Sequence, residues 1–185
     1  MEKANKGNFI TGFIGAVIGA LAGVAVWIII GKLGYISSLA ALVGMVVSAK
    51  LYDAFGGPKG AARVITLLMC LVAIVAVGTF GSYLWAAADL YNEDILAIQS
   101  YGFTKAEAET LMKTEYDNLF EYFGELMEDS ENFGLVVKDL LMGLLFGALG
   151  GVGVIVGDNK SRKQKKAEET AAQTAVNTDN NGNYY

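Results

Sequence analysis

The chain of 185 residues contains no histidine, one cysteine and one proline. Without histidine it lacks the commonest general base and a frequent zinc ligand, and a single cysteine excludes a disulfide framework. Charged residues are also scarce, at 18% of the chain, against roughly 25% in a typical soluble domain. These deficits exclude a disordered chain, a disulfide-stabilised scaffold and a histidine-based catalytic or metal site.

Apolar residues make up 54% of the chain and gather in four long runs that contain no charged residue. A bilayer core about 30 Å thick requires a helix of about 20 apolar residues, so each run is a candidate membrane span. The second span becomes long enough if Lys50 extends its charged end to the membrane surface. The sequence therefore predicts an all-α, multi-pass membrane protein. Residues 1–157 are expected to form a single bundle of four transmembrane helices, over about residues 9–31, 35–55, 63–88 and 133–157.

The distribution of charge predicts the orientation of this bundle. Basic residues concentrate at the N-terminus, between the second and third runs, and just after the fourth run, whereas residues 89–133 hold twelve acidic and two basic residues. Basic segments remain on the cytoplasmic side of a membrane. We therefore expect a cell-membrane protein with both termini in the cytoplasm, an extracytoplasmic insertion at 89–132 and a disordered cytoplasmic tail at 158–185. Trp27 and Trp85 are expected at the outer membrane–water interface.

Small residues recur at every fourth position in the four runs, which places them on one face of each helix. Lipid gives helices no hydrophobic reason to associate, so such faces allow the close backbone contact that holds a bundle together. We expect this packing within the chain. The alternatives are a groove that binds a second copy in a homo-oligomer, and the lining of a narrow pore. The strongest repeats are the glycine zippers of the first and fourth runs, at Gly15, Gly19, Gly23, Gly143, Gly147 and Gly151.

The insertion contains the pattern of an amphipathic helix. Thr104 and Glu107 form a capping box, and apolar residues recur from there to Met127 at helical spacing with acidic residues opposite. A single helix over about 104–127 is therefore expected, as a lid on the outer ends of the bundle. Alternatively, its acidic face attracts cations or docks a basic partner. The acidic cluster at 128–132 lacks the calcium-loop pattern, and we predict no metal site.

Lys138 and Asp139 are a candidate polar site inside the membrane, because ionisable residues within a span often carry function. They lie about 8 Å into the fourth span if it begins at residue 133. Asp139 is expected to cap another helix, to pair with Lys32 or to line a polar cavity. At the end of the second span, Lys50 and Asp53 are expected to pair with each other.

Five parts of the sequence together form a recognisable pattern: Gly12–Ala20, Trp27, Gly34 and Tyr35, Phe55–Gly57 and Leu135–Leu141. With these residues the chain resembles an uncharacterised family of four-span membrane proteins from clostridia-like, Gram-positive bacteria. The resemblance covers most of residues 9–150. It implies a membrane location and a four-span architecture, and it implies no activity.

The sequence contains no catalytic motif, and we predict no enzyme activity, no cofactor and no nucleic-acid partner. The expected function is that of a non-enzymatic integral membrane protein. It acts through association of its helices with each other or with a partner, in the lipid bilayer. The alternative is a small cation channel or transporter whose acidic outer vestibule concentrates cations.

Overall fold

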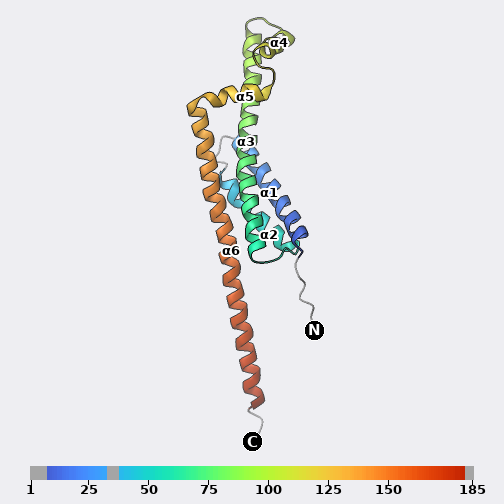
Figure 1. Cartoon of the computed structure of the whole chain (residues 1–185), viewed down its shortest axis with the longest axis vertical. Helices are drawn as coiled ribbons and strands as arrows, with labels where there is room; N and C mark the ends of the chain where they lie inside the picture. Colours follow the sequence, from blue (N-terminus) through green and yellow to red (C-terminus); the bar gives the residue numbers. More distant parts are fainter. Residues whose placement is uncertain (1–7, 33–37, 182–185) are drawn as a thin grey trace.

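The computed structural model describes residues 8–32 and 38–181, and these form six helices and no strand (Figure 1). Four of the helices pack side by side as a bundle, which α6 enters with its first half only (Figure 1). The segment that we call the head consists of α3 from Asp89 onward together with α4 and α5, and it extends beyond one end of the bundle. The elements are α1 (Phe9–Lys32), α2 (Ser38–Ala54), α3 (Ala61–Ser100), α4 (Lys105–Glu115), α5 (Leu119–Glu128) and α6 (Ser130–Asn181).

Three of these helices are long and apolar enough to cross a membrane, where the sequence predicts four. They are α1, α3 and the part of α6 from Ser130 to Gly157. The predicted span at 35–55 corresponds to α2, which has only 17 residues, and its first three predicted positions lie outside the described residues. α2 also contains two serines, a lysine and an aspartate. The long apolar helices are compatible with a membrane protein.

The head differs from its predicted form at two places. The third predicted span, 63–88, ends in the middle of α3, a helix of 40 residues. The helix continues past residue 88 because the next glycine or proline after that point is Gly102. That glycine adopts a φ of +98° and ends the helix. The capping box of Thr104 is confirmed. The helix predicted at 104–127, however, is interrupted, because the Asn118 side chain caps a new helix by accepting from the N–H groups of Phe120 and Glu121 at 2.9 and 3.2 Å.

α6 is longer than its predicted span at both ends. It begins at Ser130 because the carboxylate of Asp129 accepts from the N–H of Glu131 at 2.7 Å. At the other end it continues to Asn181, although the sequence predicts a disordered tail from residue 158. Residues 158–181 contain no glycine or proline and are rich in alanine, lysine, glutamate and glutamine, which favour helices. This part of α6 extends beyond the bundle, away from the head (Figure 1).

The bundle and the head have separate hydrophobic cores. The core of the bundle consists mainly of small residues, among which Trp27, Tyr52 and Ile74 are the largest fully buried side chains. The core of the head is a second cluster formed by Ile95, Ala108, Met112 and Tyr122, together with Ala87 just before the head. The insertion therefore folds over a core of its own at one end of the bundle.

Candidate functional site

The glycine face of α1 lies against α2. A methyl group built on Gly19 would lie 2.5 Å from Cα of Ser48, and one built on Gly23 would lie 2.8 Å from Cα of Gly44. One built on Gly15 would lie 2.5 Å from the carbonyl oxygen of Leu51. These distances are too short for any side chain, so only glycine permits this backbone approach. The repeat is therefore occupied by a neighbouring helix of the same chain.

The glycines of α6 face two other helices. Gly143 lies against the ring of Trp27, and Gly147 lies against Leu71 of α3. Gly151 is less crowded, since a methyl group there would lie 3.3 Å from the end of the Met45 side chain. α6 also comes close to the backbone of α2 at Gly150, where an added methyl group would lie 2.9 Å from the carbonyl oxygen of Leu42. Gly150 was not identified from the sequence, because it is not part of the four-residue repeat of Gly143, Gly147 and Gly151.

Trp27 is completely buried in the bundle, so its ring packs against other helices and does not face lipid headgroups or water. Its ring lies between α3 and α6, and a methyl group built on Gly78 of α3 would lie 2.7 Å from Cγ of the ring. Because Gly78 and Gly143 have no side chains, the indole fits between the two helices. One side chain of α1 thus fills the space between three helices.

The structure separates the two residues of the predicted polar site. Asp139 is half-buried and accepts a hydrogen bond from the hydroxyl of Tyr83 at 3.2 Å, whereas Lys138 is exposed. The expected pairing of Asp139 with Lys32 does not form. Lys32 lies 3.6 Å from the carboxylate of Asp89 and 4.3 Å from the centre of the Trp85 ring. Sequence reasoning missed Tyr83 as the partner, because no local pattern relates residues that are 56 positions apart.

A second polar cluster lies at the end of the bundle away from the head. Asp53 accepts from Lys59 at 2.6 Å and from the almost fully buried Arg63 at 2.7 Å, where the sequence predicts pairing with Lys50. The hydroxyl of Tyr52 donates to the carbonyl oxygen of Pro58 at 2.8 Å. These contacts hold the short turn between α2 and α3 closed.

Within the head, a tyrosine cluster fixes α5 to the end of α3. The hydroxyl of Tyr122 in α5 donates to the carboxylate of Asp94 in α3 at 2.7 Å. The Tyr122 ring also makes edge-to-face contacts with Tyr91 and Tyr116, with ring centres 5.4 and 5.0 Å apart. Burial, followed by the bond to Asp94, raises the pKa of the Tyr122 hydroxyl above its ordinary value of 10.0. The neutral phenol is therefore the form that the folded head favours.

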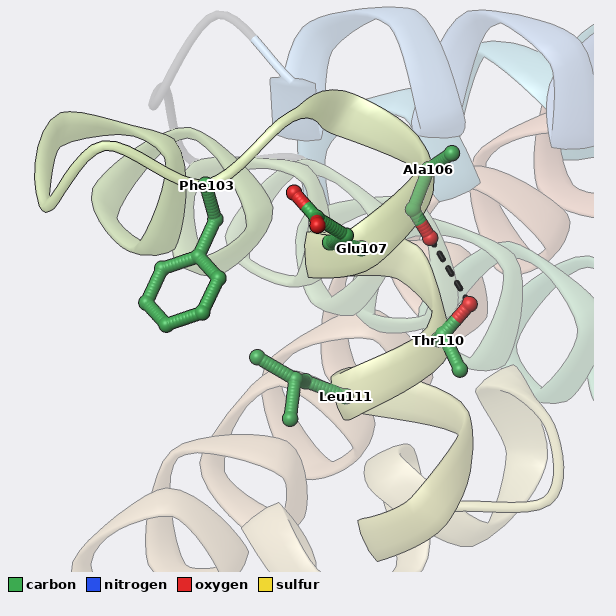
Figure 2. Close-up of a pocket in the computed structure, with 5 residues that line it drawn as sticks. All are labelled: Phe103, Ala106, Glu107, Thr110 and Leu111. Carbon is green, nitrogen blue, oxygen red and sulfur yellow. Dashed lines mark hydrogen bonds between the residues drawn. The ribbon is translucent and has the colours of Figure 1, made fainter.

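The surface of the head is acidic and carries an open groove of about 390 Å³ (Figure 2). Phe103 and Leu111 lie on the groove with 46% of each residue exposed, and Figure 2 shows both side chains on the same side of α4. Glu107 lies between them, and its carboxylate accepts from the N–H and the hydroxyl of Thr104 at 2.8 and 2.7 Å. These two bonds lower the pKa of Glu107. The groove therefore combines exposed apolar side chains with a negative charge.

No group of three or more acidic or cysteine side chains is placed to hold a metal ion anywhere in residues 8–32 and 38–181. This includes the acidic cluster at 128–132. Within that cluster Asp129 caps α6, and the side chain of Asn132 donates to the carbonyl oxygen of Leu126 at 3.0 Å. The two side chains thus have structural partners.

Comparison with protein-family models, with curated proteins and with solved structures gives no match for this chain. The resemblance to a four-span bacterial family therefore stays a prediction. What the chain can do must be inferred from its own geometry, above all from the closely packed bundle and the acidic head.

Proposed function

We propose that the protein is a four-span, non-enzymatic cell-membrane protein that presents its acidic head to a basic partner outside the cytoplasm. Both ends of the chain lie in the cytoplasm in this proposal, and α2 is the fourth span. Its 17 residues correspond to about 25 Å of helix, which is near the lower limit for crossing a bilayer. α2 also packs against α1, α3 and α6, so a short helix is supported by longer neighbours.

The packing of the bundle favours an anchor over the alternative of a cation channel. At the level of Gly23 and Gly44 the fully buried Ile74 fills the space between the helices. A methyl group on Gly44 would lie 3.0 Å from the end of the Ile74 side chain, so this level leaves no width for a hydrated path. A channel would need such a path through the bundle.

The same packing leaves the head as the surface on which the proposed partner binds. The glycine faces of α1 and α6 are filled by helices of the same chain, so a second copy has no access to them. The head and the start of α6, in contrast, carry twelve acidic residues against two basic ones within 89–133. Nearly all of these acidic residues are exposed.

One observation carries the proposal: the head has its own core, yet exposes apolar side chains at an acidic groove. An exposed apolar surface surrounded by charge is typical of a protein-binding site. Phe103 and Leu111 supply the apolar contact, and the carboxylate of Glu107 on the same groove attracts positive charge. The partner that fits is a protein segment with an apolar or aromatic side chain flanked by lysine or arginine.

The proposal is tested with the full chain in nanodiscs of uncharged lipid and two synthetic peptides. One peptide has a tryptophan–leucine centre flanked by lysines, and the other has the same centre flanked by glutamates. We expect binding of the lysine peptide only, weakened by salt, and reduced at least tenfold by the pair Phe103→Ser and Leu111→Ser. Leu96→Ser is the matched control, because Leu96 is 63% exposed on the head but lies outside the groove.

Two results would contradict the proposal. One is equal binding of the two peptides, which would show that the charge of the head does not select the partner. The other is an equal loss of binding in the groove variant and in the Leu96→Ser control.

A further inference from the structure

Four buried polar side chains of the bundle lack a hydrogen-bond partner among the described residues. Their unpaired atoms are Nε1 of Trp27, Oγ of Ser38, Oγ of Ser48 and Oγ1 of Thr79. Trp27, Ser38 and Ser48 are 0% exposed, and Thr79 is 1% exposed. Buried polar groups in proteins are nearly always paired, either with protein or with ordered water. Ser48 lies apart from the others, beside Gly19 of α1, whereas Trp27, Ser38 and Thr79 together require an explanation.

The contacts between α3 and α6 show where Thr79 lies. Leu71 and Val75 of α3 meet Gly147 and Gly143 of α6, and Tyr83 meets Asp139. Residues 71, 75, 79 and 83 are four positions apart, so they follow one face of α3. Thr79 therefore lies on the face toward α6, opposite the turn between Asp139 and Gly143.

Trp27 and Ser38 belong to the same level of the bundle. Trp27 contacts both Gly78, next to Thr79 in the chain, and Gly143. On α2, Ala41 lies beside Gly147, and α2 and α6 run in the same direction since Met45 lies beside Gly151. Ser38, about one turn before Ala41, is then at the level of Gly143. Trp27, Ser38 and Thr79 thus lie at the level of Gly143, which is about one turn along α6 from Asp139.

We propose that this level is a hydration site, in which ordered water binds Trp27, Ser38 and Thr79 and connects them to the carboxylate of Asp139. The chemistry of the groups is complementary to water. The indole N–H can only donate, each hydroxyl can donate and accept, and a carboxylate accepts. Tyr83 bonds to Oδ2 of Asp139, and Oδ1 is the oxygen that water would use.

The proposed site is closed on the side away from the head. Ile74 fills the next level, between Gly23 and Gly44. Asp139, which is half-buried, lies on the open side nearer the head. Water therefore enters and leaves past Asp139, and the site is a dead end. Asp139 therefore helps to bind water but does not form part of a conducting path through the bundle. This inference does not depend on the partner proposed for the head.

The experiment uses the indole N–H of Trp27 as the probe. The chain has two tryptophans, so Trp85→Phe leaves Trp27 as the only one, and ultraviolet resonance Raman spectra of the full chain in nanodiscs report whether its N–H is hydrogen-bonded. We expect the frequency of a bonded indole, and exchange of the N–H for N–D soon after transfer to D₂O. A frequency typical of a free indole, or an N–H that resists exchange, would overturn the proposal.

Two further variants test whether the hydroxyls hold the water. Thr79→Val removes one hydroxyl with little change in shape, and we expect the Trp27 frequency to shift toward that of a free indole. Thr66→Val is the matched control, because Thr66 is equally buried in α3 but donates to Ala62 of its own helix at 2.9 Å. An equal shift in both variants, or none with Thr79→Val, would contradict the assignment. The measurement on Trp27 itself decides the case if Thr79→Val does not fold.

Discussion

The ring of Trp27 in α1 lies directly against the backbone of Gly143 in α6, although the two residues belong to helices at opposite ends of the chain. The predicted glycine repeat of α6 thus accommodates a side chain from within the same bundle.

Gly143→Ala is therefore expected to destabilise the protein, because the added methyl group overlaps the ring of a fully buried tryptophan. Overpacking of this kind costs about 1–3 kcal/mol. Thermal unfolding in detergent, followed by circular dichroism, measures the loss. Gly153→Ala in the same helix is the control, since a methyl group there meets no atom within 4 Å, and it should be neutral or slightly stabilising. Equal stability of the two variants would refute the described packing.

Tyr83→Phe should destabilise the bundle by about 1–3 kcal/mol, because it leaves the Asp139 carboxylate without its donor from α3. The double variant Tyr83→Phe with Asp139→Leu removes both partners and should recover most of that loss. Unfolding in a denaturing detergent compares the variants. If the double variant is less stable than Tyr83→Phe alone, the hydrogen bond is not what Asp139 contributes.

The head should lose stability at alkaline pH through Tyr122. Its pKa is raised above 10.0 in the folded state, so the folded head favours the neutral phenol. The stability that the neutral Tyr122 phenol gives to the folded head is fully present below pH 10. It is lost as the pH rises from 10 toward the pKa of Tyr122 in the folded state. Limited proteolysis of α5 between pH 8 and 11 follows the change. Tyr122→Phe should be cleaved faster at pH 8 and depend less on pH, and an unchanged pH profile would rule out this role.

Thr104→Ala should loosen α4, because it removes the hydroxyl that accepts from the N–H of Glu107 and donates to its carboxylate. Loss of a threonine cap costs about 1 kcal/mol of helix stability. Hydrogen exchange of the α4 amides measures it, with Thr114→Ala as the control, since the Thr114 hydroxyl only bonds back to Thr110 within the helix at 2.9 Å. We expect faster exchange with Thr104→Ala and no acceleration with Thr114→Ala, and the reverse order would contradict it.

The features that the sequence predicts well are local. The capping box needs only Thr104 and Glu107, four residues of chain in all, and the long apolar helices follow from uninterrupted composition. At the break in the helix predicted over 104–127, two local patterns compete. Apolar periodicity runs through Asp117, but the side chain of Asn118 can cap a new helix, and that contact prevails.

The polar contacts of the bundle could not be predicted, because they depend on how helices pair in space. Tyr83 reaches Asp139 only once α3 and α6 lie side by side, and Asp53 meets Arg63 only after the turn between α2 and α3 has closed. Trp27 could equally have lain at a membrane surface. Its burial follows from Gly78 and Gly143, which lie far from it in the sequence.

The most direct test of the account is the side of the membrane on which each end of the bundle lies. In a Cys70→Ala background, single cysteines are introduced by Asn8→Cys, Leu96→Cys and Gln164→Cys and exposed to a maleimide that cannot cross membranes. With four spans and an outer head, we predict labelling of Leu96→Cys in intact cells, and of Asn8→Cys and Gln164→Cys only after permeabilisation. Labelling of Asn8→Cys in intact cells would show that α2 does not cross, and protection of Leu96→Cys would show that the acidic head is not outside.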